Sequence, residues 1–102
     1  MTKRYQITAI IYDKRGRVMS VGKNSYVKTH PLQAAHAKLA GEPHRVFLHA
    51  EIHAISLCRD LKKAHMMKIF RFLEDGSPAD ARPCPVCCSA IKAAGIQVVT
   101  HT

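Results

Sequence analysis

The first segment of the chain, residues 5–12, is apolar on both faces of an extended strand. Its alternating side chains fall into two sets: Ile7, Ala9 and Ile11 on one side, and Thr8, Ile10 and Tyr12 on the other. A strand that is apolar on both faces is typical of sheets with helices on both sides. We therefore expect this strand to be covered on both faces, in a domain of the α/β class.

The rest of the chain alternates between strand and helix patterns. The polar turn Asp13-Lys14-Arg15-Gly16 leads to a second strand at residues 17–23, which predicts a hairpin. Helices are expected at residues 31–40, 49–63 and 83–94, and strands at 66–73 and 96–100. This order contains two strand–helix–strand crossovers. It predicts one domain over residues 1–102: a compact mixed β-sheet, with an antiparallel hairpin plus parallel strands, flanked by helices.

The composition limits where such a domain can work. The chain has 102 residues, of which 47% are hydrophobic, and can bury a single core. Its apolar runs are too short to cross a bilayer, and its first residues lead into a strand pattern without a signal peptide. Four cysteines in a chain of this kind favour a reducing compartment. We expect a cytoplasmic protein that has no membrane partner.

Two short motifs supply the chemistry of a metal site. Cys84 and Cys87 are three residues apart, so they share one face in the first turn of their predicted helix. The positive end of the helix dipole favours thiolate over thiol at that position. His49 lies at the start of another predicted helix. If both helix starts point to one spot, three ligands meet with chemistry that suits zinc.

The carboxylate of Glu51 has a separate role in this arrangement. Two thiolates and a neutral imidazole balance the charge of Zn²⁺, so a fourth position can hold a water with a lowered pKa. Glu51 follows His49 by two residues and can reach the space beside that water. It would take the proton of the water, pass it to a ring nitrogen and later protonate a departing amine. The predicted reaction is hydrolytic deamination with release of ammonia.

Other interpretations of the motifs stay open at this point. A C-x-x-C pair alone is also typical of a structural zinc knuckle or a redox pair. His53 lies one helical turn after His49 and could close the site as Cys₂His₂. A structural site, however, has no use for a carboxylate two residues after its histidine. The other two cysteines, Cys58 and Cys88, are expected to pack rather than to bind metal.

At these residues the chain resembles the cytidine deaminase superfamily of zinc-dependent nucleobase deaminases. His49, Glu51, Pro83, Cys84 and Cys87 match the pattern H-x-E…P-C-x-x-C. The resemblance implies one zinc ion per chain, bound by His49, Cys84 and Cys87, with Glu51 as the proton shuttle.

The resemblance also implies substrate contacts and a departure from the family. Asn24 matches a position where relatives place an asparagine against the sugar or base, and Ala50 would offer its backbone to the base edge. Relatives often carry a helix before the first strand and further elements after the last one. This chain starts its first strand within a few residues and stops at Thr102, so an exposed sheet edge is expected. A homo-oligomer or a bound substrate could cover that edge.

The charge of the chain favours an anionic substrate. Sixteen Lys and Arg against seven Asp and Glu leave a net charge of +9, a field that suits a polyanion. Basic side chains also precede the first motif: Lys23, Lys28, His30, Lys38, His44 and Arg45. Arg82 directly precedes the second motif, and Tyr26 is a candidate stacking surface for a base. We predict deamination of cytosine to uracil in single-stranded DNA or RNA.

Three alternatives remain from the sequence. The substrate could be free cytidine, deoxycytidine or a monophosphate of either. It could be adenosine in nucleic acid, since His49-Ala50-Glu51-Ile52 with Pro-Cys-x-x-Cys is also similar to the tRNA adenosine deaminases. The domain could instead be a binding module with a structural zinc, in which case Glu51 would be expendable.

Overall fold

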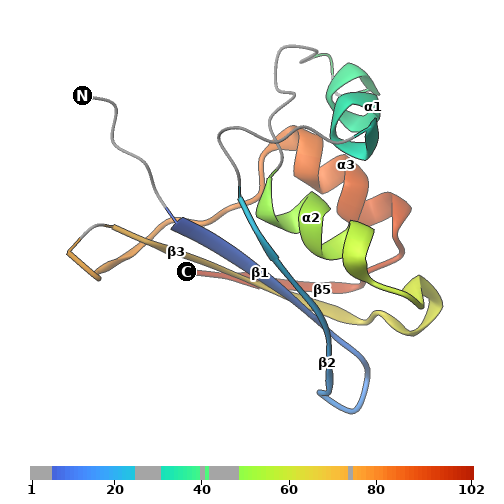
Figure 1. Cartoon of the computed structure of the whole chain (residues 1–102), viewed down its shortest axis with the longest axis horizontal. Coiled ribbons are helices and arrows are strands. Elements are labelled where there is room, and N and C mark those ends of the chain that lie inside the picture. Colours follow the sequence, from blue (N-terminus) through green and yellow to red (C-terminus); the bar gives the residue numbers. More distant parts are fainter. Residues whose placement is uncertain (1–5, 25–30, 40, 42–48, 74) are drawn as a thin grey trace.

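The structure, a computed structural model, describes residues 6–24, 31–39, 41, 49–73 and 75–102 (Figure 1). Its strands are β1 (Gln6–Tyr12), β2 (Val18–Lys23), β3 (Met66–Phe72), β4 (Pro78–Ala79) and β5 (Val98–His101). Its helices are α1 (Pro31–Leu39), α2 (Ala50–Leu57) and α3 (Pro85–Ala93), with a short 3₁₀ helix η1 (Leu61–Lys63). The predicted mixed α/β fold is confirmed.

One mixed sheet organises these elements. β1 pairs antiparallel with β2 on one side and with β3 on the other. The far side of β3 is shared by β4, which is antiparallel, and β5, which is parallel. The predicted hairpin is therefore present, and α3 makes the crossover between the parallel strands β3 and β5.

The core lies between one face of this sheet and the helices α2 and α3 (Figure 1). Its fully buried larger side chains are Ile11, Ile52, Met67, Ile69, Val86 and Cys87. The other face of β1, with Thr8, Ile10 and Tyr12, is half-buried. The prediction that both faces of this strand are covered is thus wrong for the described elements, which place their helices on a single face. Strand periodicity reports apolar faces but does not say what covers them.

Several element boundaries also differ from the prediction, and one predicted connection contains a strand. α2 ends at Leu57 rather than near residue 63, because Cys58 adopts an extended backbone (φ −75°, ψ 115°) and its N–H bonds back to Ile55. α3 begins at Pro85, which fits the preference of proline for the first helical turn. The connection predicted as turns contains the strand β4, whose Ala79 carbonyl accepts a hydrogen bond from Thr102 Oγ1 at 2.6 Å.

Within the described ranges, the structure contains no helix with the length and apolar character needed to span a membrane.

Candidate active site

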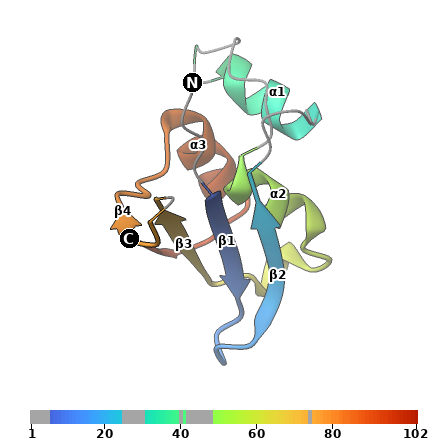
Figure 2. The ribbon, with the colours of Figure 1, turned by 60° about the vertical axis from the view of Figure 1, so that its left-hand side comes forward.

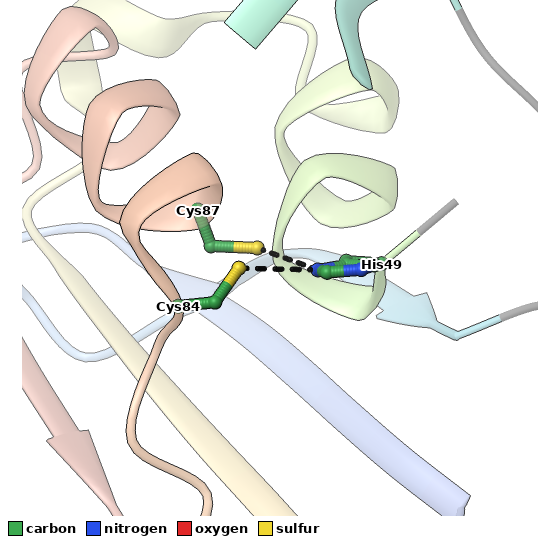
Figure 3. A group of neighbouring side chains, drawn as sticks. All are labelled: His49, Cys84 and Cys87. Atoms are coloured by element: carbon green, nitrogen blue, oxygen red, sulfur yellow. Dashed lines mark hydrogen bonds between the residues drawn. The ribbon is translucent and has the colours of Figure 1, made fainter. Parts of the chain in front are cut away.

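The site is built where two helices begin side by side. His49 is the N-cap of α2 (φ −86°, ψ 154°) and Cys84 is the N-cap of α3 (φ −72°, ψ 168°). Neither side chain caps its own helix, although N-cap residues usually bond to the first free backbone N–H groups. Both side chains point instead across the gap between the helix starts, toward each other (Figure 3).

Three metal-binding atoms converge in that gap. His49 Nδ1 lies 3.2 Å from Cys87 Sγ and 3.5 Å from Cys84 Sγ. All three atoms lie within 4.8 Å of one another. Cys87 comes from the first turn of α3 and is buried, whereas His49 and Cys84 are half-buried. The convergence of helix starts that the sequence indicated is present.

The donor set fits zinc. A tetrahedral ion with the bond lengths of zinc holds an imidazole nitrogen and a thiolate sulfur about 3.5 Å apart. The two Nδ1–Sγ distances, 3.2 and 3.5 Å, are already close to that spacing. Among the described residues, no further His, Cys, Asp or Glu belongs to this group of ligand atoms. The centre therefore offers three protein ligands and leaves one position open, as catalytic zinc sites do.

The two cysteines differ in their affinity for a proton when no metal is bound. A hydrogen bond from the Cys87 thiol, aided by His49, lowers the pKa of Cys84 to about 3. The same hydrogen bond to Cys84, together with burial, raises the pKa of Cys87. One thiolate is thus already present in the metal-free protein, and Cys87 must lose its proton when a metal binds.

Glu51 lies beside these ligands in the first turn of α2. Its side chain is only 5% exposed. Burial raises the pKa of its carboxyl, against the opposing effect of a hydrogen bond with Cys87. A carboxyl whose pKa is raised exchanges its proton closer to neutral pH, as general acids and bases in enzymes do.

His53, the rival ligand, lies outside the cluster. Its Nδ1 lies 3.0 Å from the backbone nitrogen of Lys23 and 3.2 Å from the carbonyl oxygen of the same residue. These contacts hold the imidazole against the end of β2. In the described part of the chain, the Cys₂His₂ arrangement is therefore not formed.

Two residues of β2, which sequence reasoning missed, set the position of α2. A Cβ added at Gly22 would lie 2.8 Å from Ala54 Cα, and closer still to the Ala50 carbonyl oxygen and the Ala54 nitrogen. The buried Ser20 hydroxyl donates a 2.7 Å hydrogen bond to the Ala54 carbonyl. A glycine inside a strand often marks such a close backbone approach, and that signal was present in the sequence.

The residues predicted to contact the substrate differ in their positions and in the contacts that they already make. Asn24 Oδ1 accepts a 3.0 Å hydrogen bond from the Ile7 backbone N–H, which orients its carboxamide at the end of the hairpin. Ala50 is fully buried beside His49. Arg82 is exposed and donates a 2.9 Å hydrogen bond to Asp80. Tyr26 lies outside the described residues.

The two remaining cysteines differ in their exposure to solvent. Cys58 is buried in the core, as expected. Cys88 is exposed, with its Sγ 3.6 Å from the Pro83 carbonyl oxygen, so the expectation that it packs inside is wrong. It follows Cys87 by one residue, and this step of about 100° turns it outward.

The fold and the site together define a metal-dependent enzyme centre on an α/β scaffold, with three protein ligands, one open position and a buried carboxyl. A family model for the zinc-binding region of cytidine and deoxycytidylate deaminases matches residues 1–102, and the chain belongs to this family. A search of curated proteins finds no match to the chain. Zinc-dependent deamination is the general chemistry that follows from the family and the His–Cys–Cys centre.

Proposed function

We propose that this chain hydrolyses cytosine to uracil in single-stranded DNA or RNA. The observation that carries the chemistry is the convergence of His49, Cys84 and Cys87 next to the buried Glu51. Three ligands with an adjacent carboxyl suit hydrolysis, whereas a structural zinc site requires four ligands and no such carboxyl.

Each residue of the centre has a distinct task. His49 Nδ1 and the sulfurs of Cys84 and Cys87 would hold zinc, which supplies Lewis-acid activation of a water molecule. The Glu51 carboxylate takes a proton from the attacking water and delivers it to the ring nitrogen of the base. Water adds to the carbon that bears the exocyclic amine. Glu51 then takes the remaining proton of the added hydroxyl and passes it to the amine. The carbon–nitrogen bond breaks, the oxygen becomes the carbonyl of uracil, and ammonia leaves.

The charge of the chain supports a polynucleotide as the carrier of the base. The net charge is +9, and exposed Lys23 directly precedes Asn24 at the end of β2. The strand has to be single, or the base flipped out, because the reacting carbon is out of reach inside a duplex. Asn24, Ala50 and Tyr26 are the proposed contacts to the nucleotide. Arg82 would have to leave Asp80 in order to join them.

A second candidate is the deamination of free cytidine, deoxycytidine or deoxycytidylate. The description of the matching family, which names cytidine and deoxycytidylate, favours it. Such substrates need a small pocket with one phosphate contact and do not need a positive electrostatic field that extends over the protein surface.

Uracil release separates the two candidates. The zinc-loaded protein is incubated with a cytosine-containing single strand, the matching duplex, free cytidine and deoxycytidylate. Turnover of the single strand alone, abolished in Glu51→Gln and retained in the exposed control Asp60→Asn, is the expected result. Turnover confined to free cytidine or deoxycytidylate would overturn the polynucleotide substrate. Inosine from adenine-containing strands, without uracil, would overturn the choice of base.

A further inference from the structure

A basic groove lies at the other end of the domain from the His–Cys–Cys centre. It has a volume of about 630 Å³. Its lining comes from the β1–β2 turn, from η1 and the residues after it, and from the loop before β5: Asp13, Lys14, Arg15, Arg17, Lys62, Lys63, Ala64, His65, Gly95 and Gln97. We call this surface the basic groove.

The backbone holds the three segments of the basic groove together. His65 N–H donates to the Tyr12 carbonyl at 2.9 Å, which ties the start of β3 to the hairpin. Gln97 N–H donates to the His65 carbonyl at 3.1 Å, which ties in the loop before β5. The concave shape is therefore part of the folded domain and does not depend on side-chain positions alone.

Among the described residues that line the groove, the one acidic side chain is Asp13, and it is used within the turn. Its carboxylate accepts hydrogen bonds from the backbone N–H groups of Arg15 and Arg17 and from Arg17 Nε, each at 2.9 Å. The hydrogen bond from the Arg17 backbone is the main reason that the pKa of Asp13 is lowered. Asp13 stays ionised and fixes the turn, so that the turn presents Lys14 and Arg15 on a rigid backbone.

Most of the positive charge of the basic groove is not neutralised by neighbours. Arg17 pairs with Asp13 at 2.9 Å, and Lys63 lies at the 4.0 Å limit of an ion pair with Asp60. Lys14, Arg15 and Lys62 take part in none of the ion pairs recorded for the described residues. Exposed ion pairs are weak interactions, so the pairs of Arg17 and Lys63 do not offset the charge of the other three side chains. The basic groove therefore stays strongly positive.

The basic groove and the catalytic centre lie at opposite ends of the sheet. Tyr12, at the groove, pairs with the first residue of β3, whereas Gln6 pairs with the last one. The helix starts that carry His49 and Cys84 lie at the Gln6 end, and the hairpin turn lies at the other end (Figure 2). The length of β1, seven residues, puts about 20 Å between the two ends.

We propose that the basic groove binds the phosphate backbone of a single-stranded nucleic acid whose target base enters the catalytic centre. Lys14 and Arg15 come from the β1–β2 turn, and Lys62 and Lys63 come from η1, so a strand in the basic groove can contact both segments. A flat anionic membrane fits this concave surface poorly. The choice of a nucleic acid as the anion rests on the proposed function, because a polynucleotide alone carries both a reactive base and distant phosphates.

The separation of the two sites predicts a minimum length. A strand that stays stacked rises about 3.4 Å per nucleotide, so about 7 stacked nucleotides reach from the centre to the basic groove. A shorter stacked strand can occupy only one of the two sites.

Salt-dependent binding of a cytosine-free strand tests the basic groove directly. The probe is a fluorescent oligothymidylate of about 12 nucleotides, titrated with the zinc-loaded protein at several salt concentrations. Each phosphate contact on a single strand makes the fall of log K with log salt steeper by about 0.7, which corresponds to about a fivefold change in K between 1 M and 0.1 M salt. We test two double variants, Lys62→Gln/Lys63→Gln and Lys14→Gln/Arg15→Gln. Each is expected to make the slope shallower by about 1.4 and to weaken binding about 25-fold at 0.1 M salt.

A matched control removes the same charge elsewhere. Arg59 and Lys92 are exposed and do not line the basic groove. The control pair Arg59→Gln/Lys92→Gln is expected to keep most of the slope. If it weakens binding as much as the groove pairs do, the effect is one of net charge and the proposal is overturned.

A second probe separates a strand from a small anion. Inorganic tripolyphosphate is titrated in the same way. If it binds as tightly as the oligothymidylate and responds equally to the groove pairs, the basic groove is a small-anion site and the proposal fails. Because neither probe contains cytosine, these results are independent of turnover. Groove-dependent binding without any deamination of single strands would contradict the proposed substrate and support the groove.

Discussion

The close contact between β2 and α2 makes Gly22→Ala the most informative single substitution in this domain. Gly22 is not among the glycines with positive φ, so alanine brings no backbone strain of its own. The whole effect comes from the added Cβ, which would lie 2.8 Å from Ala54 Cα and closer to two further backbone atoms of α2. Backbone cannot rotate away as a flexible side chain can.

The size of the effect follows from these contacts. Ordinary van der Waals contact begins at 3.4 Å, so α2 has to move by more than about 0.6 Å at both Ala54 and Ala50. Overpacking of this kind destabilises a protein by about 1–3 kcal/mol. The displacement also reaches the adjacent residues His49 and Glu51. A misplacement of about 1 Å can lower a catalytic rate about 100-fold.

Three measurements on one preparation separate the two effects: urea unfolding, zinc content and turnover. The control is Gly76→Ala, in the turn between β3 and β4, where an added Cβ meets nothing within 4 Å but φ is +87°. That control is expected to lose about 1 kcal/mol of stability and no turnover per folded molecule. Ser20→Ala, which removes a hydrogen bond to the same helix without adding an atom, gives a second variant should Gly22→Ala fold poorly. Wild-type turnover and zinc content in Gly22→Ala would refute the reasoning.

Three further predictions concern the centre itself. The raised pKa of Glu51 means that the metal-free folded protein holds this proton more tightly than the unfolded chain does, so the associated stability is present at low pH and is lost as pH rises through the folded pKa. Glu51→Gln should therefore make the metal-free protein more stable than wild type at pH 8, as measured by urea unfolding, and a variant that is less stable at pH 8 would contradict this. In the zinc-loaded protein the same substitution should lower turnover at least about 100-fold. Because the pKa of Cys84 is lowered to about 3, its alkylation by iodoacetamide in the metal-free protein should change little between about pH 5 and 8, whereas an ordinary thiol slows about tenfold per unit below its pKa. Peptide mass spectrometry measures this rate, and a tenfold fall per unit at Cys84 would disprove the assignment of the thiolate. His53→Ala should retain one zinc per chain and lose about 1 kcal/mol through its contact with Lys23, and loss of the metal would revive the four-ligand site.

The sequence predicted the ligand geometry well because that geometry depends on local structure. Cys84 and Cys87 are brought together by one turn of α3, and His49 and Glu51 by one turn of α2. Only the meeting of the two helix starts required tertiary structure; the sequence stated it as a condition, and the structure fulfils that condition. Local periodicity was sufficient for the rest.

What the sequence could not predict depends on contacts between distant segments. The two-residue strand β4 exists because Thr102 and β3 pair with it, and no local pattern encodes that pairing. The pairing of Arg82 with Asp80 redirects a side chain that had been assigned to the substrate. The end of α2 at Leu57 follows from the turn at Cys58, within a run of residues that are otherwise compatible with a helix.

The location of two ligands at N-cap positions has a consequence for the chain as a polymer. His49 and Cys84 are separated by 35 residues, so a metal bound by both closes a loop of that length. A cross-link over such a loop removes about 4 kcal/mol of conformational entropy from the unfolded chain. An ion bound there would act as a removable cross-link between the first turns of α2 and α3. The folded fraction of this small protein would then depend by mass action on the concentration of available zinc.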